Sequence, residues 1–257
     1  MPLEDLGFQL LLFVIAVIAN ALSAIAGGGA GLIQLPILIF LGLPFAIALA
    51  THKVASVALG VGASFKHLKS STLQLPVSLA IVLGGLPGVI LGANTILLIP
   101  EQVAKLALGC LTIGLGVYSF FKPELGKNKF KKNRNKSGLL FGALGCFLLG
   151  FLNGSLTSGT GLFVTLWSIR WFGLDYRQAT AHTLVLVGLF YNSTGAITLG
   201  LQQSIQWSWL PALLLGSLLG GYVGAHLSVV KGNGFIKRIF EITTIAVGIK
   251  LIQHSLS

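Results

Sequence analysis

This chain contains an internal duplication that extends over nearly its whole length. Gly29-Ala30-Gly31-Leu32 recurs as Gly159-Thr160-Gly161-Leu162, and the offset between matching positions stays between 130 and 132 residues. The fold is therefore expected to consist of two similar halves. The further matches are Gly42-Leu43 with Gly173-Leu174, Thr51-His52 with His182-Thr183, Gly88-x3-Gly92-Ala93 with Gly220-x3-Gly224-Ala225, Lys105 with Lys237, and Gly116 with Gly248.

The composition places the duplicated chain in a membrane. Hydrophobic residues make up 54% of its 257 residues, charged residues only 9%, and the mean hydropathy is +0.89. Soluble domains carry roughly 25% charged residues. Apolar runs of about 20 residues, each long enough to cross a hydrocarbon core of about 30 Å, cover most of the chain. In a membrane protein, such a duplication is typical of a transporter with its binding site between the halves.

The net charge of +11 does not indicate a nucleic-acid-binding protein. The basic residues lie in short loops between apolar runs, where positive charge faces the cytoplasm. The acidic start of the chain leads directly into an apolar segment, whereas a cleavable signal peptide begins with basic residues. We therefore expect this segment to be retained, and the protein to be a multi-pass protein of a plasma membrane of the bacterial inner-membrane type.

Two of the ten predicted apolar segments, 31–42 and 161–172, are too short to span a membrane. About 12 residues at 1.5 Å each make about 18 Å of helix. Pro44 suits the first turn of the following helix, and Asp175 suits an N-cap. The other predicted segments are 7–26, 44–65, 75–98 and 101–121 in the first half, and 138–157, 176–200, 207–229 and 235–255 in the second.

Two topologies are compatible with these short segments. Residues 7–42 and 138–172 each form either one broken span, which gives parallel repeats, or a hairpin that returns to the same side, which gives inverted repeats. With the central basic loop in the cytoplasm, the hairpin topology places every basic residue inside except Lys53, Lys105 and Lys250. The parallel topology would expel Arg170, Arg177, Lys231, Lys237 and Arg238, against the positive-inside rule.

The sequence thus predicts an all-α polytopic membrane protein with two inverted repeats. Each repeat is expected to contain a glycine-broken helical hairpin and three transmembrane helices. The first repeat would comprise residues 1–121, the basic cytoplasmic loop residues 122–137, and the second repeat residues 138–257. Both termini are expected outside.

The glycine clusters at the two hairpins are candidates for a binding site. Irregular backbone at membrane depth persists only where it is buried in protein or lines a wet cavity. Helices that begin near Gly31 and Gly161 would present N–H groups and partial positive charge to a small oxyanion. The glycines at four-residue spacing (Gly84, Gly88, Gly92, Gly216, Gly220 and Gly224) are instead expected to allow close helix packing.

Polar residues within the membrane follow each hairpin. Thr51, His52 and Lys53 lie about 10 Å below the surface, and His182 and Thr183 lie equally deep in the second half. A charged lysine at the bilayer centre costs roughly 2.5–3.5 kcal/mol, so Lys53 must face protein, a cavity or an anion. The histidines can donate hydrogen bonds and exchange protons near neutral pH, or they only pack.

Most of the other polar residues within the apolar segments are expected to have structural roles. Asn192 contributes either to the site or to a hydrogen bond between helices. Asn20 and Asn153 precede the hairpins and are expected to satisfy freed backbone groups. Lys237 and Glu241 are expected to form an ion pair. The predicted substrate-binding residues are Gly29, Gly31, Thr51, His52, Lys53, Gly159, Thr160, Gly161, His182, Thr183 and Asn192; no catalytic residue, metal ligand or cofactor is predicted.

The duplicated motif resembles the sulfite exporter TauE/SafE family of membrane permeases over essentially the full chain. The resemblance implies transport of sulfur-containing oxyanions such as sulfite, sulfonates or sulfoacetate. The residues that carry it are Gly27–Gly31, Leu32, Pro36, Gly42-Leu43, Ala48 and Thr51 in the first copy, and Gly159-x-Gly161-Leu162, Gly173-Leu174, Ala179 and Thr183 in the second.

Three functions are compatible with these features. The favoured one is a secondary transporter of a small anion by alternating access, with a coupled proton or sodium ion and with the lipid bilayer and a second copy of the chain as partners. A passive anion channel is the second. An intramembrane hydrolase that uses Ser155 and His182 is the third and least favoured, because no turn around Ser155 suits a nucleophile.

Overall fold

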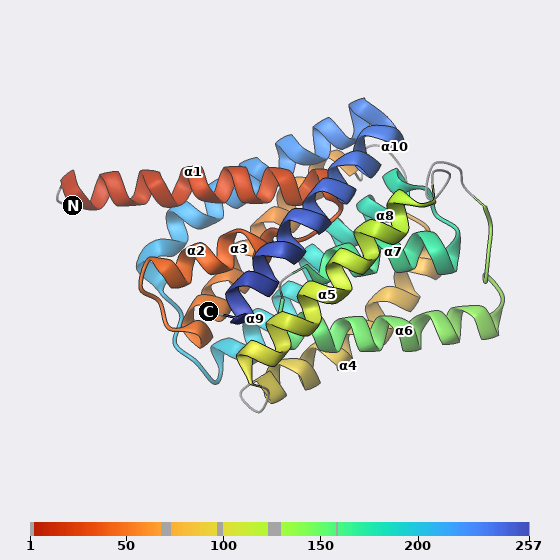
Figure 1. Ribbon diagram of the computed structural model, residues 1–257, viewed down its shortest axis with the longest axis horizontal. Helices are drawn as coiled ribbons and strands as arrows, with labels where there is room; N and C mark the ends of the chain where they lie inside the picture. The colour runs from red at the N-terminus through yellow and green to blue at the C-terminus, as the bar shows by residue number, and fades with distance from the viewer. Residues whose placement is uncertain (1–2, 68–72, 97–99, 123–129, 158, 257) are drawn as a thin grey trace.

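A computed structural model describes residues 3–67, 73–96, 100–122, 130–157 and 159–256. Within these ranges the structure is helical and contains no strand, and six helices are long and apolar enough to cross a membrane (Figure 1). The predicted all-α membrane fold is confirmed. Lys69, Ser158 and residues 123–129 of the predicted basic loop lie outside the described residues. The helices are α1 Leu3–Ala26, α2 Gln34–Phe40, α3 Phe45–His67, α4 Leu75–Thr95, α5 Glu101–Phe120, α6 Lys136–Ser155, α7 Thr160–Phe172, α8 Tyr176–His182, α9 Asn192–Gly200 and α10 Leu210–Leu256.

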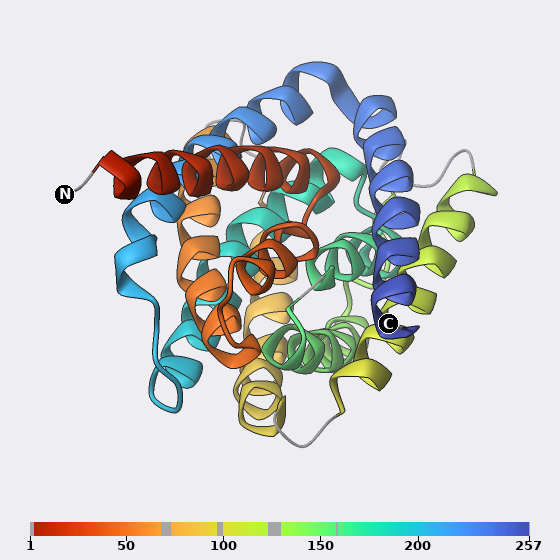
Figure 2. The ribbon, with the colours of Figure 1, turned by 60° about the vertical axis from the view of Figure 1, so that its left-hand side comes forward.

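The chain reverses after α1 through three glycines. Gly27, Gly28 and Gly29 have φ values of 88°, 133° and 105°, which L side chains rarely adopt. The amide N–H groups of Gly27 and Gly28 both donate to the carbonyl of Ser23, at 3.0 and 2.8 Å, and so close the end of α1. The predicted break in the first hairpin is therefore present, and α2 then runs back alongside α1 (Figures 1 and 2).

The short segment of the first hairpin differs from the prediction of one helix beginning near Gly31. It consists of a single 3₁₀ turn, Ala30–Leu32, followed by α2, which begins only at Gln34. Pro36 explains the late start: proline has no N–H to donate, so it is tolerated only in the first turn of an α-helix. In the second hairpin α7 is continuous from Thr160 and is 13 residues long.

Two pairs of helices pack closely, α4 against α6 and α10 against α1, and each pair joins one helix of the first half to one helix of the second. A Cβ atom on Gly88 of α4 would lie 2.1 Å from the carbonyl oxygen of Phe147 on α6, and one on Gly220 of α10 would lie 2.5 Å from that of Val17 on α1. The predicted packing role of the spaced glycines is confirmed. The contacts, each between a glycine and a carbonyl oxygen, are Gly84–Ala143, Gly88–Phe147 and Gly92–Phe151 for α4 and α6, and Gly216–Phe13, Gly220–Val17 and Gly224–Ala21 for α10 and α1.

These contacts pair helices across the two halves. By the repeat offset, Gly88 of the first half matches Gly220 of the second, and Val17 of the first half matches Phe147 of the second. The contact Gly88–Phe147 is therefore the counterpart of the contact Gly220–Val17. In Figure 1, α1 begins at the left end of the molecule and α6 begins at the right end. The matching helices α1 and α6 thus run in opposite directions.

Two long helices are interrupted. Gly232, with φ 78° and ψ −176°, bends α10 into the two arms predicted as 207–229 and 235–255, and the bend is plain in Figure 2. Between α8 and α9, residues Thr183–Tyr191 form a π-helix, a feature frequent at functional sites. A Cβ atom on Gly60 of α3 would lie 2.5 Å from the carbonyl carbon of Gly188, so α3 crosses this π-helix in backbone contact.

Candidate functional site

The two glycine hairpins touch each other. A Cβ atom placed on Gly28 would lie 2.5 Å from the Cα atom of Gly161, and one placed on Gly161 would lie 2.8 Å from the Cα atom of Gly28. The hydroxyl of Thr165, on α7, donates to the carbonyl of Gly27 at 2.6 Å. Glycine is needed at both positions because the backbones meet where a side chain would stand.

A small cavity of about 40 Å³ lies beside this contact. One water molecule needs roughly 10–15 Å³, so the cavity has room for a few water molecules or one small ion. Both hairpins, α3 and the π-helix contribute to it, and none of its described lining residues carries a carboxylate. It is lined by Ser23, Gly28, Gly29, Ala30, Gly31, His52, Ser56, Leu59, Asn153, Thr157, Thr160, Gly161, Thr183, Leu184, Val187, Gly188 and Asn192.

Seven of the eleven predicted site residues lie at this cavity. They come from both halves: Gly29, Gly31, His52, Thr160, Gly161, Thr183 and Asn192. Lys53 lies directly behind two of the lining residues. Gly159 does not line the cavity but precedes α7 as its N-cap, with φ 76°. Thr51 and His182 lie elsewhere.

The ammonium group of Lys53 is fully buried and has only neutral partners. Its Nζ atom donates to the carbonyl oxygen of Asn153 at 2.7 Å and to the Oδ1 atom of that side chain at 2.6 Å. The Oδ1 atom of Asn192 lies 3.4 Å away. The lysine stem packs on Gly195, where a Cβ atom would approach its Cε atom to 3.1 Å. When it is protonated, Lys53 thus places a positive charge one side chain away from the cavity.

His52 belongs to a chain of hydrogen bonds that leads from the cavity to α10. Its Nδ1 atom lies 3.2 Å from the Oε1 atom of Gln34, and its Nε2 atom lies 3.1 Å from the hydroxyl of Ser56. The same Gln34 oxygen accepts from Asn20 at 3.2 Å, and Asn20 also donates to Ser217 at 3.0 Å. With Gln34 Oε1 as the acceptor of this contact, the proton of a neutral His52 ring lies on its Nδ1 atom.

Thr51 and His182 have the same structural role in the two halves. The hydroxyl of Thr51 accepts from the backbone N–H of Gln206 at 3.0 Å, ahead of α10. The Nε2 atom of His182 accepts from the backbone N–H of Gln74 at 2.9 Å, ahead of α4, and its Nδ1 atom lies 2.7 Å from the carbonyl of Gln178. Both side chains tie the helix that follows a hairpin to the start of a packing helix.

The positions that are equivalent in the two halves by their contacts are therefore not those that share the same residue type. Thr51 corresponds to His182, and His52 corresponds to Thr183. His52 faces Gln34 on the first short helix, and the hydroxyl of Thr183 lies 2.8 Å from that of Thr165 on the second. His52 and Thr183 both line the cavity.

Sequence reasoning missed Asn153 as a component of the cavity wall. Asn153 contacts Lys53, and its Nδ2 atom donates to the hydroxyl of Thr160 at 2.8 Å. It also has the expected role, because its carbonyl accepts from the N–H and the hydroxyl of Thr157, at 3.2 and 3.0 Å. The sequence did offer a signal for this residue, because Asn153 precedes the second hairpin as Asn20 precedes the first.

The structure does not form the serine–histidine pair considered for a hydrolase. The hydroxyl of Ser155 donates to the carbonyl of Phe151 at 2.9 Å, within its own helix. Both ring nitrogens of His182 are engaged with backbone groups.

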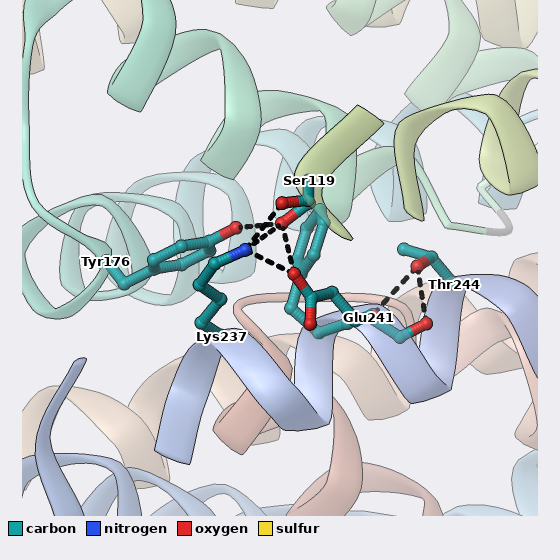
Figure 3. Close-up of polar contacts among 6 residues, drawn as sticks. Ser119, Tyr176, Lys237, Glu241 and Thr244 are labelled. Carbon is teal, nitrogen blue, oxygen red and sulfur yellow. Dashed lines mark hydrogen bonds and ion pairs between the residues drawn. The ribbon is translucent and has the colours of Figure 1, made fainter. Parts of the chain in front are cut away.

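The predicted ion pair of Lys237 and Glu241 is confirmed, and it is part of a larger cluster (Figure 3). The Nζ atom of Lys237 also donates to the carbonyl of Ser119 at 2.5 Å, and the Ser119 hydroxyl lies 2.8 Å from that of Tyr176. The cluster joins α5, α8 and the second arm of α10. The matching position to Glu241 in the first half is Gly109, so the first half has no equivalent acid there.

Six described helices that are long and apolar enough to cross a membrane, with a polar cavity lined by residues of both halves, are the features expected of a multi-pass helical membrane transporter. The family model of the sulfite exporter TauE/SafE matches residues 12–251. The chain belongs to this family.

Similar proteins cover almost the whole chain. A probable membrane transporter protein of Haemophilus influenzae is 32% identical over 250 residues, covering 96% of each chain. The probable membrane transporter protein ORF9 of a Sinorhizobium species is 31% identical over 253 residues, covering 97% of this chain and 95% of its own. The probable membrane transporter protein YfcA of Escherichia coli K12 is 28% identical over 244 residues, covering 95% and 89% respectively. No solved structure shows a significant match.

Proposed function

We propose that this protein is a secondary transporter that carries small oxyanions, sulfur-containing ones such as sulfite, sulfonates or sulfoacetate, by alternating access. The observation that carries the proposal is the cavity between the hairpins with the buried charge of Lys53 behind its wall. An isolated buried charge is costly, and an anion in the cavity would offset that cost. The family's description supplies the sulfur chemistry.

The polar groups of the cavity suit an oxyanion. The side-chain NH₂ of Asn192 and the hydroxyl of Thr183, which accepts from Thr165, can donate hydrogen bonds, and the described lining residues offer no carboxylate to repel an anion. The start of α7 at Thr160 and Gly161 adds the positive end of a helix dipole at the cavity wall.

The helix contacts between the two halves support inverted repeats as the moving parts. Each half contributes one helix to each of the pairs α4–α6 and α10–α1, so a rocking of these pairs would expose the cavity to one side at a time. With the central basic loop in the cytoplasm, both termini lie outside. A coupled proton or sodium ion would supply the driving force.

Uptake of radiolabelled sulfite into proteoliposomes tests the proposal. The wild type is expected to accumulate label against its gradient when a proton or sodium gradient is imposed. Gly161→Leu is expected to abolish uptake because its side chain would displace the backbone of Gly28. Gly114→Leu, on the exposed face of α5 with no atom within 4 Å of an added Cβ, is the matched control.

Two results would contradict the proposal. Full uptake by Gly161→Leu would exclude the hairpin contact from the transport mechanism. Dissipation of the gradient with measurable single-channel conductance, without accumulation, would indicate the passive channel instead.

A further inference from the structure

We propose that the cavity selects singly charged oxyanions, with Lys53 as the counter-charge, and discriminates against both dianions and neutral analogues. This inference rests on the proposed transport of oxyanions through the cavity. It narrows the substrate class to simple sulfonates and singly protonated sulfite. Of the anions named in the proposed function, sulfoacetate carries two negative charges and would therefore be disfavoured, as would sulfate.

First, the charge at the cavity can come only from His52 and Lys53 among the described residues at and behind its wall. His52 is the one described lining residue that can become charged, and Lys53 is the cation immediately behind the wall. Two described carboxylates are committed elsewhere: Asp175 caps α8 by accepting from the N–H of Gln178 at 2.7 Å, and Glu241 pairs with Lys237. The charge that faces an incoming solute is therefore positive.

The second step is the state of His52. A neutral ring with its proton on Nδ1 satisfies both neighbours, since Nδ1–H donates to Gln34 and Nε2 accepts from Ser56. A second proton would place two buried positive charges on adjacent residues, which is costly without a carboxylate. The site with a neutral His52 carries one positive charge.

The third step is how this charge acts on a solute. The oxygen atoms of the Asn153 and Asn192 side chains point to the ammonium group of Lys53. Their NH₂ groups consequently point away from it; that of Asn153 reaches Thr160, which also lines the cavity. Lys53 is thus a positioning residue and a counter-charge, and the solute would meet amide and hydroxyl groups.

Charge balance follows from these steps. A single negative charge in the cavity forms a neutral assembly with Lys53. A dianion leaves one negative charge uncompensated in the membrane interior, and a neutral solute leaves Lys53 uncompensated, both of which are unfavourable. The cavity is therefore expected to bind a solute with one negative charge more tightly than a dianion or a neutral solute.

Isothermal titration of the full-length protein in detergent with three compounds of similar shape tests this inference. The probes are methanesulfonate with one negative charge, sulfate with two, and dimethyl sulfone with none. Methanesulfonate is expected to bind at least about tenfold more tightly than either of the others, which corresponds to the loss of one modest charge interaction. Lys53→Gln is expected to remove this preference, and Lys53→Arg to retain it.

A second variant keeps the test decisive if Lys53→Gln does not fold. Gly195→Ala displaces the Lys53 side chain without removing its charge, because the added Cβ would lie 3.1–3.3 Å from the Cε, Cδ and Nζ atoms. It is expected to weaken methanesulfonate binding several-fold, roughly 3- to 10-fold, while Gly114→Ala leaves it unchanged.

The outcomes separate this inference from the proposed function. Sulfate binding as tightly as methanesulfonate, or an unchanged preference in Lys53→Gln, would overturn charge selection while leaving an anion site in place. Absence of binding by all of the anions, sulfite included, would overturn the proposed function itself.

Discussion

At the scale of single residues, Thr51 and His182 show that a position can keep its role while its side chain changes. Each supplies an acceptor for the backbone N–H of a glutamine that precedes a packing helix, at 3.0 Å for Gln206 and 2.9 Å for Gln74. A hydroxyl oxygen and an unprotonated imidazole nitrogen both accept a hydrogen bond. What the two halves share at this position is acceptor capacity.

Removal of either acceptor is expected to destabilise the protein. Thr51→Val leaves the N–H of Gln206 without its acceptor, and His182→Leu does the same to Gln74, at a cost of roughly 1–3 kcal/mol each. Thermal unfolding in detergent, followed by circular dichroism, measures the change. Thr51→Ser should retain the wild-type stability.

Thr198→Val is the matched control for these variants. The Thr198 hydroxyl donates only to the carbonyl of Thr194 in its own helix, at 2.8 Å. Its replacement is expected to change the stability by less than about 0.5 kcal/mol. A loss as large as that of Thr51→Val would show that a generic effect of valine, and not the bond to Gln206, is being measured.

The sequence located most cavity residues but assigned their correspondence incorrectly. Thr51 was paired with Thr183 by identity, although the repeat offset drifts between 130 and 132 residues and also allows His182. Only the contacts decide, because they show which side chain points into the cavity. Asn153 was likewise recognised as a backbone partner, while its contact with Lys53, 100 residues away in sequence, was not predictable.

At the scale of helices, the spaced glycines determine how closely the pairs α4–α6 and α10–α1 pack. Added Cβ atoms on Gly92 and Gly224 would lie 2.1 Å from the carbonyl oxygen of Phe151 and 2.3 Å from that of Ala21. These contacts are with backbone atoms, which cannot move aside as the end of a flexible side chain can. The spacing alone predicted this packing, because a period of four residues places small residues on one helix face.

Gly92→Leu and Gly224→Leu are expected to have similar effects on stability, since the two sites are equivalent in the two halves. Overpacking typically costs about 1–3 kcal/mol, and a clash with backbone places these variants at or above that range. Thermal unfolding of the purified proteins measures the loss, with Gly114→Leu as the control. Wild-type stability in one variant only would contradict the equivalence of the two helix pairs.

The hairpins were predictable in position but not in detail. Clusters such as Gly27–Gly29 identify a break because only glycine adopts their φ values without strain. The 3₁₀ turn before α2 and the π-helix between α8 and α9 were not predicted. Both depend on how the chain meets its neighbours, as the backbone contact of Gly60 with Gly188 shows.

At the scale of the whole molecule, each of the helix pairs α4–α6 and α10–α1 contains one helix from each half of the chain. Figure 1 shows α1 and α6 running in opposite directions, as the positive-inside rule led us to expect. Hydropathy and charge act on whole segments, so they predicted the apolar helices, whereas the inverted relation of the two repeats stays a prediction. The meeting of Gly28 with Gly161, and the cavity beside it, depends on contacts between distant parts of the chain and could not be predicted in detail.

Cysteine accessibility in intact cells tests the inverted orientation. In a background without Cys110 and Cys146, the exposed positions Arg170 and Lys231 are expected to react, when replaced by cysteine, only with reagents that reach the cytoplasm. Ser204→Cys, in the turn before α10, is expected to react from outside. Labelling of the Arg170 and Lys231 positions from outside, as the parallel topology requires, would contradict inverted repeats.

The location of a bound anion tests the central claim, that the substrate site lies between the two hairpins. Selenite carries selenium in place of the sulfur of sulfite, and its position can be read directly from anomalous scattering at the selenium edge in crystals of the complex. An anomalous peak is expected inside the cavity bounded by Gly28, Gly161 and Asn192. A peak only elsewhere, with this cavity empty in crystals of protein shown to bind selenite, would contradict the claim.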